Sequence, residues 1–174
     1  MTITCESRDS ERGLSIIECV FAISLVAILA AGLRPLSVLA TLTTENQGHL
    51  AARTTEYAQD KLEQLLGLEY VDLTTDTRTF PATPGTGTGL AIGGSSDPAA
   101  PAAQYVDYLD VDGTLLPAAG AQAPAGWFYK RVWQVTQASA NLKQITVTAI
   151  VRQAIGSVGQ IPQSTVGAYK TFPF

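Results

Sequence analysis

The feature that most constrains this chain is an apolar run near its N-terminus, from Leu14 to Leu33. These twenty residues carry a single charge, Glu18. A helix of that length spans the hydrocarbon core of a bilayer, at about 1.5 Å per residue. The run therefore predicts a membrane-spanning helix. It also contains a carboxylate where a lone charge costs several kcal/mol, so Glu18 needs a partner or a proton.

The segment before the run, Met1–Gly13, does not have the order of a secretory signal. Such a signal begins with positive charge and carries a small-residue cleavage site after its apolar stretch. Here three acids and two arginines give one net negative charge, and the small residue, Gly13, precedes the apolar run.

Composition excludes several classes of function. The formal net charge is -4, which argues against nucleic-acid binding because the phosphate backbone needs a basic face. The only cysteines are Cys5 and Cys19, so nothing after Cys19 can form a disulfide. A zinc site of the usual composition is excluded, because the only histidine is His49 and no Cys/His cluster accompanies it.

Beyond the run, the helical pattern continues. Pro35 lies where it can kink a long helix without ending it. An apolar stripe then recurs at helical spacing, with Lys61 among the polar residues of the opposite face, and Gly67 is the expected stop. The stripe consists of Ala51, Thr55, Ala58, Leu62 and Leu65.

The rest of the chain predicts loops followed by a small antiparallel sheet. Residues 74–126 are rich in Gly, Pro, Ala and Thr and are predicted to form long loops, including a flexible GTGTG segment at 85–89. Alternating patterns predict strands at 105–111, 128–135 and 144–152, the last two joined as a hairpin. The tail from residue 156 is expected to be mostly irregular, with an edge strand near 166–171. The amphipathic half of the helix is expected to cover one face of this sheet.

A family resemblance rests on the N-terminal residues. Gly13, followed by Leu14-Ser15-Ile16-Ile17-Glu18 and a long apolar run, resembles the signal of type IV pilins and type II secretion pseudopilins. The resemblance implies that prepilin peptidase cuts between Gly13 and Leu14 and methylates the new amine of Leu14. It makes Glu18 the fifth residue of the mature chain, and it makes Pro35 the helix-bending proline of many of these proteins.

Residues 51–66 and 129–152 extend the likeness, being similar to the helix and the sheet hairpin of PilV-like minor pilins and of I-type pseudopilins. The chain departs from the family in three respects. Leu14 replaces the usual phenylalanine, the leader is acidic, and the C-terminal region has no cysteines for the disulfide of many major pilins. The last difference favours a minor pilin.

The fold implied by the resemblance is α+β and type IV pilin-like, with a long N-terminal helix packed on a small antiparallel sheet. Its expected divisions are a cleaved leader (1–13), a transmembrane and filament-core helix (14–34), an amphipathic helix (35–68) and a periplasmic sheet domain (69–174). The implied location is the inner membrane, and then a pilus or pseudopilus. The implied partners are prepilin peptidase, other minor pilins, the major pilin and the inner-membrane assembly platform. No cofactor, metal or catalytic residue is expected.

The new amine at Leu14 would supply the partner that Glu18 needs. In a filament, Glu18 of one subunit would pair with the Leu14 amine of the next, which compensates the charge and fixes axial register. Methylation keeps the amine positive. The alternative is a carboxylate tolerated near the membrane interface.

A second motif, LDVDGTLL at 109–116, resembles the nucleophile loop of haloacid-dehalogenase phosphatases, with Asp110 and Asp112 in the catalytic positions. That chemistry needs a parallel strand before the loop, so a hairpin turn at Asp112-Gly113 is the preferred interpretation. A calcium site using Asp107, Asp110 and Asp112 is left open. The sequence thus predicts a minor pilin, with a type II secretion pseudopilin as the alternative and a membrane-anchored phosphatase as a more distant one.

Overall fold

The computed structural model of this protein describes residues 15–117, 122–153 and 161–173, except for the side chains of helix positions 34–37, 39, 42 and 43. The predicted cleavage site at Gly13 and Leu14 lies outside the described residues. The chain divides into two compact units, Met1–Leu42 and Thr43–Phe174.

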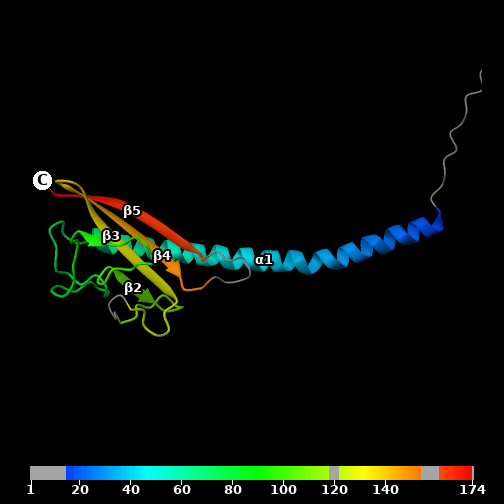
Figure 1. The fold of residues 1–174 in the computed structure, drawn as a ribbon, viewed down its shortest axis with the longest axis horizontal. Coiled ribbons are helices and arrows are strands. Elements are labelled where there is room, and N and C mark those ends of the chain that lie inside the picture. The colour runs from blue at the N-terminus through cyan, green and yellow to red at the C-terminus, as the bar shows by residue number, and fades with distance from the viewer. Residues whose placement is uncertain (1–14, 118–121, 154–160, 174) are drawn as a thin grey trace, which may run out of the picture. The chain divides into compact units, whose positions relative to one another are not determined.

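The described elements are one helix and five strands, so the coarse α+β prediction is confirmed (Figure 1). In chain order they are α1 (Ile16–Leu66), β1 (Gly93–Gly94), β2 (Val106–Leu109), β3 (Tyr129–Ser139), β4 (Leu142–Val151) and β5 (Gln163–Thr171).

Helix α1 ends where the sequence predicted. Its last residue is Leu66, and the Gly67 N–H closes the final turn by donating to the Glu63 carbonyl at 2.9 Å. The helix is assigned without a break through position 35. Because the side chain of Pro35 is not described, the kink there stays a prediction.

The second unit contains an antiparallel sheet in the order β1-β3-β4-β5, with β2 also paired to β3. The predicted hairpin is β3–β4, which turns at residues 140 and 141. The tail is more regular than predicted, because β5 is nine residues long and begins at Gln163. Strand β1 was not predicted, since its two glycines carry no side-chain pattern.

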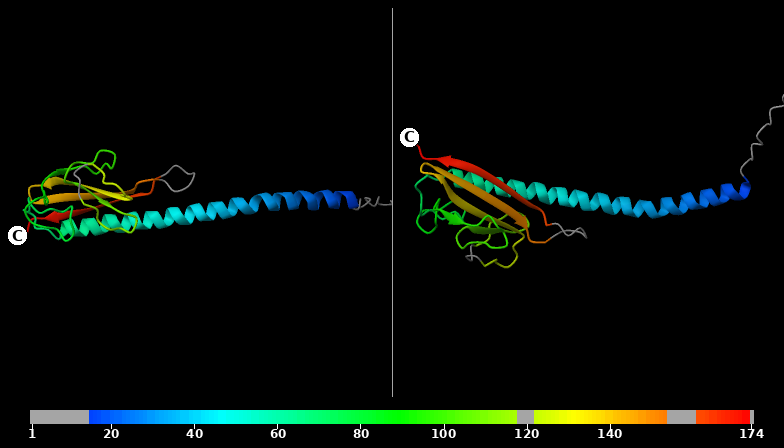
Figure 2. Two further views of the ribbon diagram at one scale, coloured as in Figure 1. Left: turned by 90° about the horizontal axis from the view of Figure 1, so that it is seen from below. Right: turned by 45° about the horizontal axis from the view of Figure 1, so that its top comes forward.

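Within this unit, the C-terminal part of α1 lies along one face of the sheet (Figure 2). The apolar core between them is drawn from both elements. The helix contributes Leu50, Tyr57, Ala58 and Leu65, and the strands contribute Leu109, Tyr129, Trp133, Val135, Ile145, Val147, Ala149 and Val151.

The buried face of the helix differs from the predicted stripe in two ways. Ala51 is exposed, whereas Thr54 and Tyr57 are buried in its place. Lys61, predicted on the polar face, is completely buried. The buried face of the helix therefore carries larger side chains than the predicted stripe, and it includes one charged residue, Lys61.

The opposite face of the sheet carries a smaller apolar cluster. Val106, Tyr108 and Val132 are buried there, and Leu116 and Trp127 from the loops pack over them. The rings of Tyr108 and Trp127 meet edge to face, with centroids 5.6 Å apart. Part of the long loop region therefore serves as a second layer of the fold.

The GTGTG segment predicted as flexible is instead fixed by backbone hydrogen bonds. The Gly87 N–H donates to the Thr74 carbonyl at 2.8 Å, and the Gly89 N–H donates to the Thr75 carbonyl at 2.9 Å. A Cβ at Gly87 would lie 2.2 Å from the Thr75 carbonyl oxygen. The glycine is required because two backbone segments pass this close to each other.

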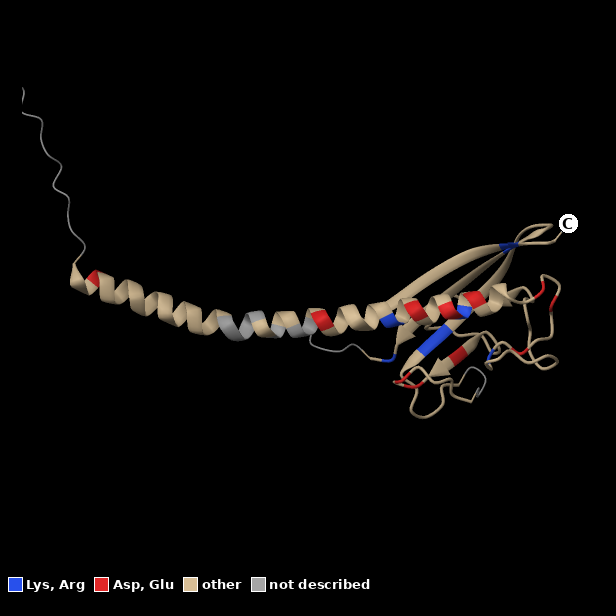
Figure 3. Ribbon diagram, turned by 180° about the vertical axis from the view of Figure 1, so that it is seen from behind, with Lys and Arg blue, Asp and Glu red and all other residues tan. Residues whose placement is uncertain are grey.

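A buried ion cluster joins the helix to the sheet. Asp107 on β2 and Arg131 on β3 are register partners, and the guanidinium donates to both carboxylate oxygens, from Nε at 2.7 Å and from Nη2 at 2.9 Å. The ammonium of Lys61 lies 2.6 Å from Asp107 Oδ2 and 4.3 Å from the ring centroid of Trp133. Figure 3 shows basic and acidic segments of neighbouring strands side by side in this unit.

The fourth member of the cluster, Asp60, balances the charge. Its Oδ2 accepts a hydrogen bond from Arg131 Nη1 at 2.9 Å, and its side chain is 54% exposed. Two cations and two carboxylates therefore sum to zero, as a buried site requires. Removing Asp107 would leave two buried cations with only a half-exposed carboxylate beside them.

We predict that Asp107→Asn destabilises the protein by about 3–5 kcal/mol, because it leaves buried charge uncompensated. The measurement is chemical unfolding of the full chain in detergent, followed by tryptophan fluorescence. Asp112→Asn, at an exposed position, is the matched control and is expected to change stability by less than about 0.5 kcal/mol. Equal effects of the two variants would contradict the role given to Asp107.

Candidate functional site

The first candidate site is the N-terminal part of α1, described here by itself. Residues 16–33 form a helix long and apolar enough to cross a membrane. All of them are exposed, including Phe21, Ile23 and Leu29. An apolar surface this large is not stable in water, so it points to lipid or to other helices as its surroundings.

Glu18 lies in the first turn of this helix. Its Oε2 accepts a hydrogen bond from the Ser15 N–H at 3.1 Å. Ser15 immediately precedes the helix, so the Ser15–Glu18 spacing is that of a capping box. A carboxylate is also favoured there by the helix dipole. Glu18 therefore has a local structural partner in addition to the one predicted at Leu14, which lies outside the described residues.

Two residues that could react or bind metal in other settings have exposed side chains with no metal-binding partners beside them among the described residues. Cys19 is a free, exposed thiol next to Glu18, and His49 is exposed on α1. In the described ranges, no group of three or more His, Cys, Asp or Glu side chains is placed to hold a metal ion.

In the turn after β2, the carboxylate of Asp110 accepts hydrogen bonds from backbone groups of the same turn. Asp110 Oδ1 accepts hydrogen bonds from the backbone N–H groups of Asp112 at 2.9 Å and Thr114 at 2.8 Å. Gly113 has a φ of 87°, in the region that favours glycine. The turn predicted at this motif is confirmed, and the strand before it pairs antiparallel with β3, whereas the phosphatase interpretation requires a parallel strand.

The three aspartates considered for calcium do not come together. Asp107 is held in the ion cluster by Lys61 and Arg131, with a side chain 1% exposed. Asp112 is exposed at the tip of the turn. Sequence spacing suggested a shared site because Asp107 and Asp110 are only three residues apart, but Asp107 faces the helix.

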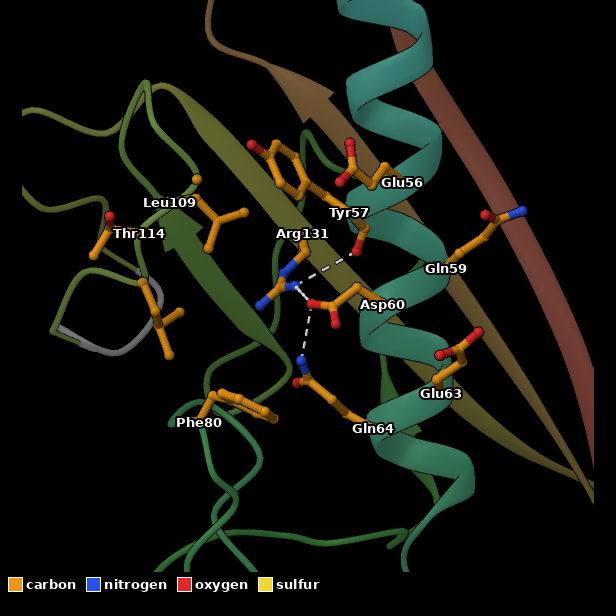
Figure 4. A pocket seen from close by; sticks show the side chains of 12 residues that line it. Glu56, Tyr57, Gln59, Asp60, Glu63, Gln64, Phe80, Leu109, Thr114 and Arg131 are labelled. Atoms are coloured by element: carbon orange, nitrogen blue, oxygen red, sulfur yellow. Dashed lines mark hydrogen bonds and ion pairs between the residues drawn. The ribbon is translucent and has the colours of Figure 1, made fainter.

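A cavity of about 670 Å³ lies beside the ion cluster, between α1 and the loops that carry Phe80 and Thr114 (Figure 4). Asp60 points into it from the helix. Its Oδ2 accepts hydrogen bonds from Gln64 Nε2 and from Arg131 Nη1, both at 2.9 Å. Phe80 forms part of the opposite wall and is 69% exposed. The cluster is neutral and Asp60 forms an ion pair with Arg131. The residues that line the cavity therefore include no unpaired buried charge that could bind a ligand.

The ion cluster shifts the acid–base properties of its members. Burial lowers the pKa of Lys61 to about 8, against a normal value of 10.5, and the neighbouring Asp107 only partly offsets this. Burial alone would raise the pKa of Asp107, but the charges of Arg131 and Lys61 hold it below its ordinary value. The Asp107 carboxylate is therefore ionised in the folded protein at neutral pH.

Sequence reasoning did not identify this cluster. It singled out residues near the N-terminus, of which Glu18 is described and lies in the first turn of α1; its predicted role in assembly stays a prediction. Comparison with family models, curated proteins and solved structures finds no match for this chain.

A pH prediction follows from Lys61. Between about pH 8 and pH 10.5, the unfolded chain keeps a proton on Lys61 that the folded chain has released, so rising pH favours the folded state through this group. The difference in unfolding free energy between wild type and Lys61→Met should therefore increase across this range, by at most about 3 kcal/mol.

The measurement is chemical unfolding of both proteins at a series of pH values. Comparing wild type with Lys61→Met removes the contributions of the other titrating groups, which the two proteins share. A difference that stays constant with pH would show that the pKa of Lys61 is not lowered.

Proposed function

We propose that this chain is a minor pilin, a structural subunit of a type IV pilus. The main observation behind the proposal is how apolar and charged side chains are distributed along α1. Its first part is apolar and exposed on every side, with one acid in the first turn, and the same helix continues into a small antiparallel sheet domain. The resemblance of residues 13–35 to the prepilin signal supplies the family.

In this proposal, the chain is first inserted in the inner membrane with its sheet domain in the periplasm. Prepilin peptidase cuts between Gly13 and Leu14 and methylates the Leu14 amine. Residues 14–33 then leave the lipid and pack against the helices of other pilins in the filament core. This transfer keeps the apolar surface away from water at every stage.

Glu18 has the assembly role in this proposal. Its carboxylate pairs with the Leu14 amine of a neighbouring subunit, in surroundings where neither charge is well solvated. The bond from the Ser15 N–H supports this role, because it holds the side chain near the start of the helix, one residue from the new amine.

A type II secretion pseudopilin would share the signal, the helix and the processing. The long loop region, residues 74–126, favours the pilus, because I-type pseudopilins are usually shorter. A strain lacking this protein separates the two: loss of pili supports the proposal, and loss of protein secretion with normal pili supports the pseudopilin.

The processing prediction is that the mature protein begins with N-methylated Leu14. Mass spectrometry of the protein purified from cells with an active prepilin peptidase measures this directly. The matched control is the same chain from cells lacking the peptidase, which should retain residues 1–13. An intact leader in both strains would refute the proposal.

The assembly prediction concerns Glu18. Glu18→Ala should be processed normally but enter pili about tenfold less, because the charge partner is lost. Glu18→Gln distinguishes the two roles, since glutamine keeps the capping bond to Ser15 but has no charge. Both variants should therefore be equally defective, as measured by immunoblot of sheared pili.

Glu45→Ala, which changes an exposed acid on the same helix, is the control and should assemble normally. Normal incorporation of Glu18→Gln would show that the cap, and not the charge pair, is what assembly requires.

A further inference from the structure

A short part of α1 is polar on every side. Residues 44–49 have the sequence Thr-Glu-Asn-Gln-Gly-His and contain no apolar side chain. Five of the six residues are exposed, and Gln47 is half-buried. The apolar core of the second unit begins only at the next residue, Leu50, which is 6% exposed. The segment is therefore helical although it contributes no side chain to that core.

The residue types of this segment stabilise a helix poorly. Threonine, asparagine and histidine have a lower intrinsic helix propensity than alanine or leucine, and glycine is less favourable than any residue except proline. Gly48 adds this cost in the interior of the helix, because its backbone has the most freedom to lose. Glu45 has no lysine or arginine three or four residues away, so ion pairs one turn apart do not offset the cost.

Other parts of α1 have a source of stability that residues 44–49 lack. From Leu50 onward the helix packs on the sheet and takes part in the buried ion cluster through Lys61. Residues 16–33 are apolar, and in lipid no water competes for their backbone hydrogen bonds. Most helical stability in proteins comes from packing rather than from propensity. A helical segment that is polar all round and has neither packing nor ion pairs is only weakly stable.

We infer that residues 44–49 are a weak point of α1, which unwinds and reforms while the sheet and the packed part of the helix stay folded. Local opening of this kind occurs where few side chains are buried and the backbone hydrogen bonds are exposed to solvent. Water reaches residues 44–49 from nearly every side, so it can replace their helical hydrogen bonds as these break. No core contact is lost in the process.

Unwinding changes how far these six residues reach. As a helix they span about 9 Å, at about 1.5 Å per residue, and as an extended chain they span up to about 20 Å. The weak point therefore supplies about 10 Å of slack on the N-terminal side of Leu50. A load applied to the apolar part of α1 would extend this segment before it disturbed the packed part of the helix.

This inference goes beyond the minor-pilin proposal and does not depend on it. Residues 44–49 belong to the second unit, Thr43–Phe174, and their unwinding requires neither cleavage at Gly13 nor the charge of Glu18. An intact leader in the processing experiment would leave the experiment on this segment unaffected, and the reverse also holds.

The test is hydrogen exchange of the full chain in detergent, followed by mass spectrometry of short peptides and corrected for intrinsic exchange rates. The amides of residues 44–49 should exchange at least about tenfold faster than those of residues 55–66, because opening the first segment breaks no core contact. The amides of β3 and β4 should stay protected over the same period. Equal protection of the two helix segments would overturn the inference, and so would exchange of residues 44–49 at the same rate as β3.

The variant Gly48→Ala tests the cause of the opening. A Cβ at Gly48 would meet no atom within 4 Å outside its own part of the helix, so alanine adds helix propensity without a clash. Gly48→Ala should therefore slow the exchange of residues 44–49 about fivefold. Gly32→Ala is the matched control, because a Cβ there also meets nothing within 4 Å. It should leave the exchange of residues 44–49 unchanged.

Two outcomes of this comparison would contradict the inference. An unchanged exchange rate in Gly48→Ala would show that the segment does not open by unwinding. Equal slowing by Gly32→Ala would show that the opening belongs to the whole helix and not to residues 44–49. Both variants place alanine at exposed helix positions, so both are expected to fold, and the comparison within the wild-type protein stands without them.

Discussion

The second unit depends on one buried carboxylate. Asp107 is the only anion fully inside the cluster, and both Lys61 from the helix and Arg131 from the neighbouring strand converge on it. Such a cluster is a poor source of net stability, because desolvation offsets most of the attraction. We expect its effect to be on specificity, since another rotation or register of the helix would bury Lys61 without Asp107 beside it.

The same helix meets two different environments along its length. Between Ile16 and Leu33 every side chain is exposed and nearly all are apolar, whereas from Leu50 onward one face is buried against strands and the other is polar. No single solvent satisfies both parts. The first part is long and apolar enough to cross a membrane, whereas the second part packs on the sheet of its own unit.

Most of the fold could be predicted because its signals are periodic. The apolar run, the stop at Gly67 and the alternation in β3 and β4 each follow from local spacing. The ion cluster was not predicted, because a lysine within a polar helix face is usually solvated. Alternation offered a usable signal: Arg131 lies in phase with Tyr129 and Trp133, and so on the buried face of β3. The order within residues 72–90 could not be predicted, because it comes from backbone contacts between segments rather than from side-chain pattern.

The residues of the candidate sites, like the fold, could be predicted only in part. Glu18 was identifiable because a single charge interrupts an apolar run, but its bond to Ser15 adds a local role that the family resemblance did not include. Strand β5 was predicted as an edge strand near residues 166–171 and does stand at the end of the strand order, but it begins earlier, at Gln163.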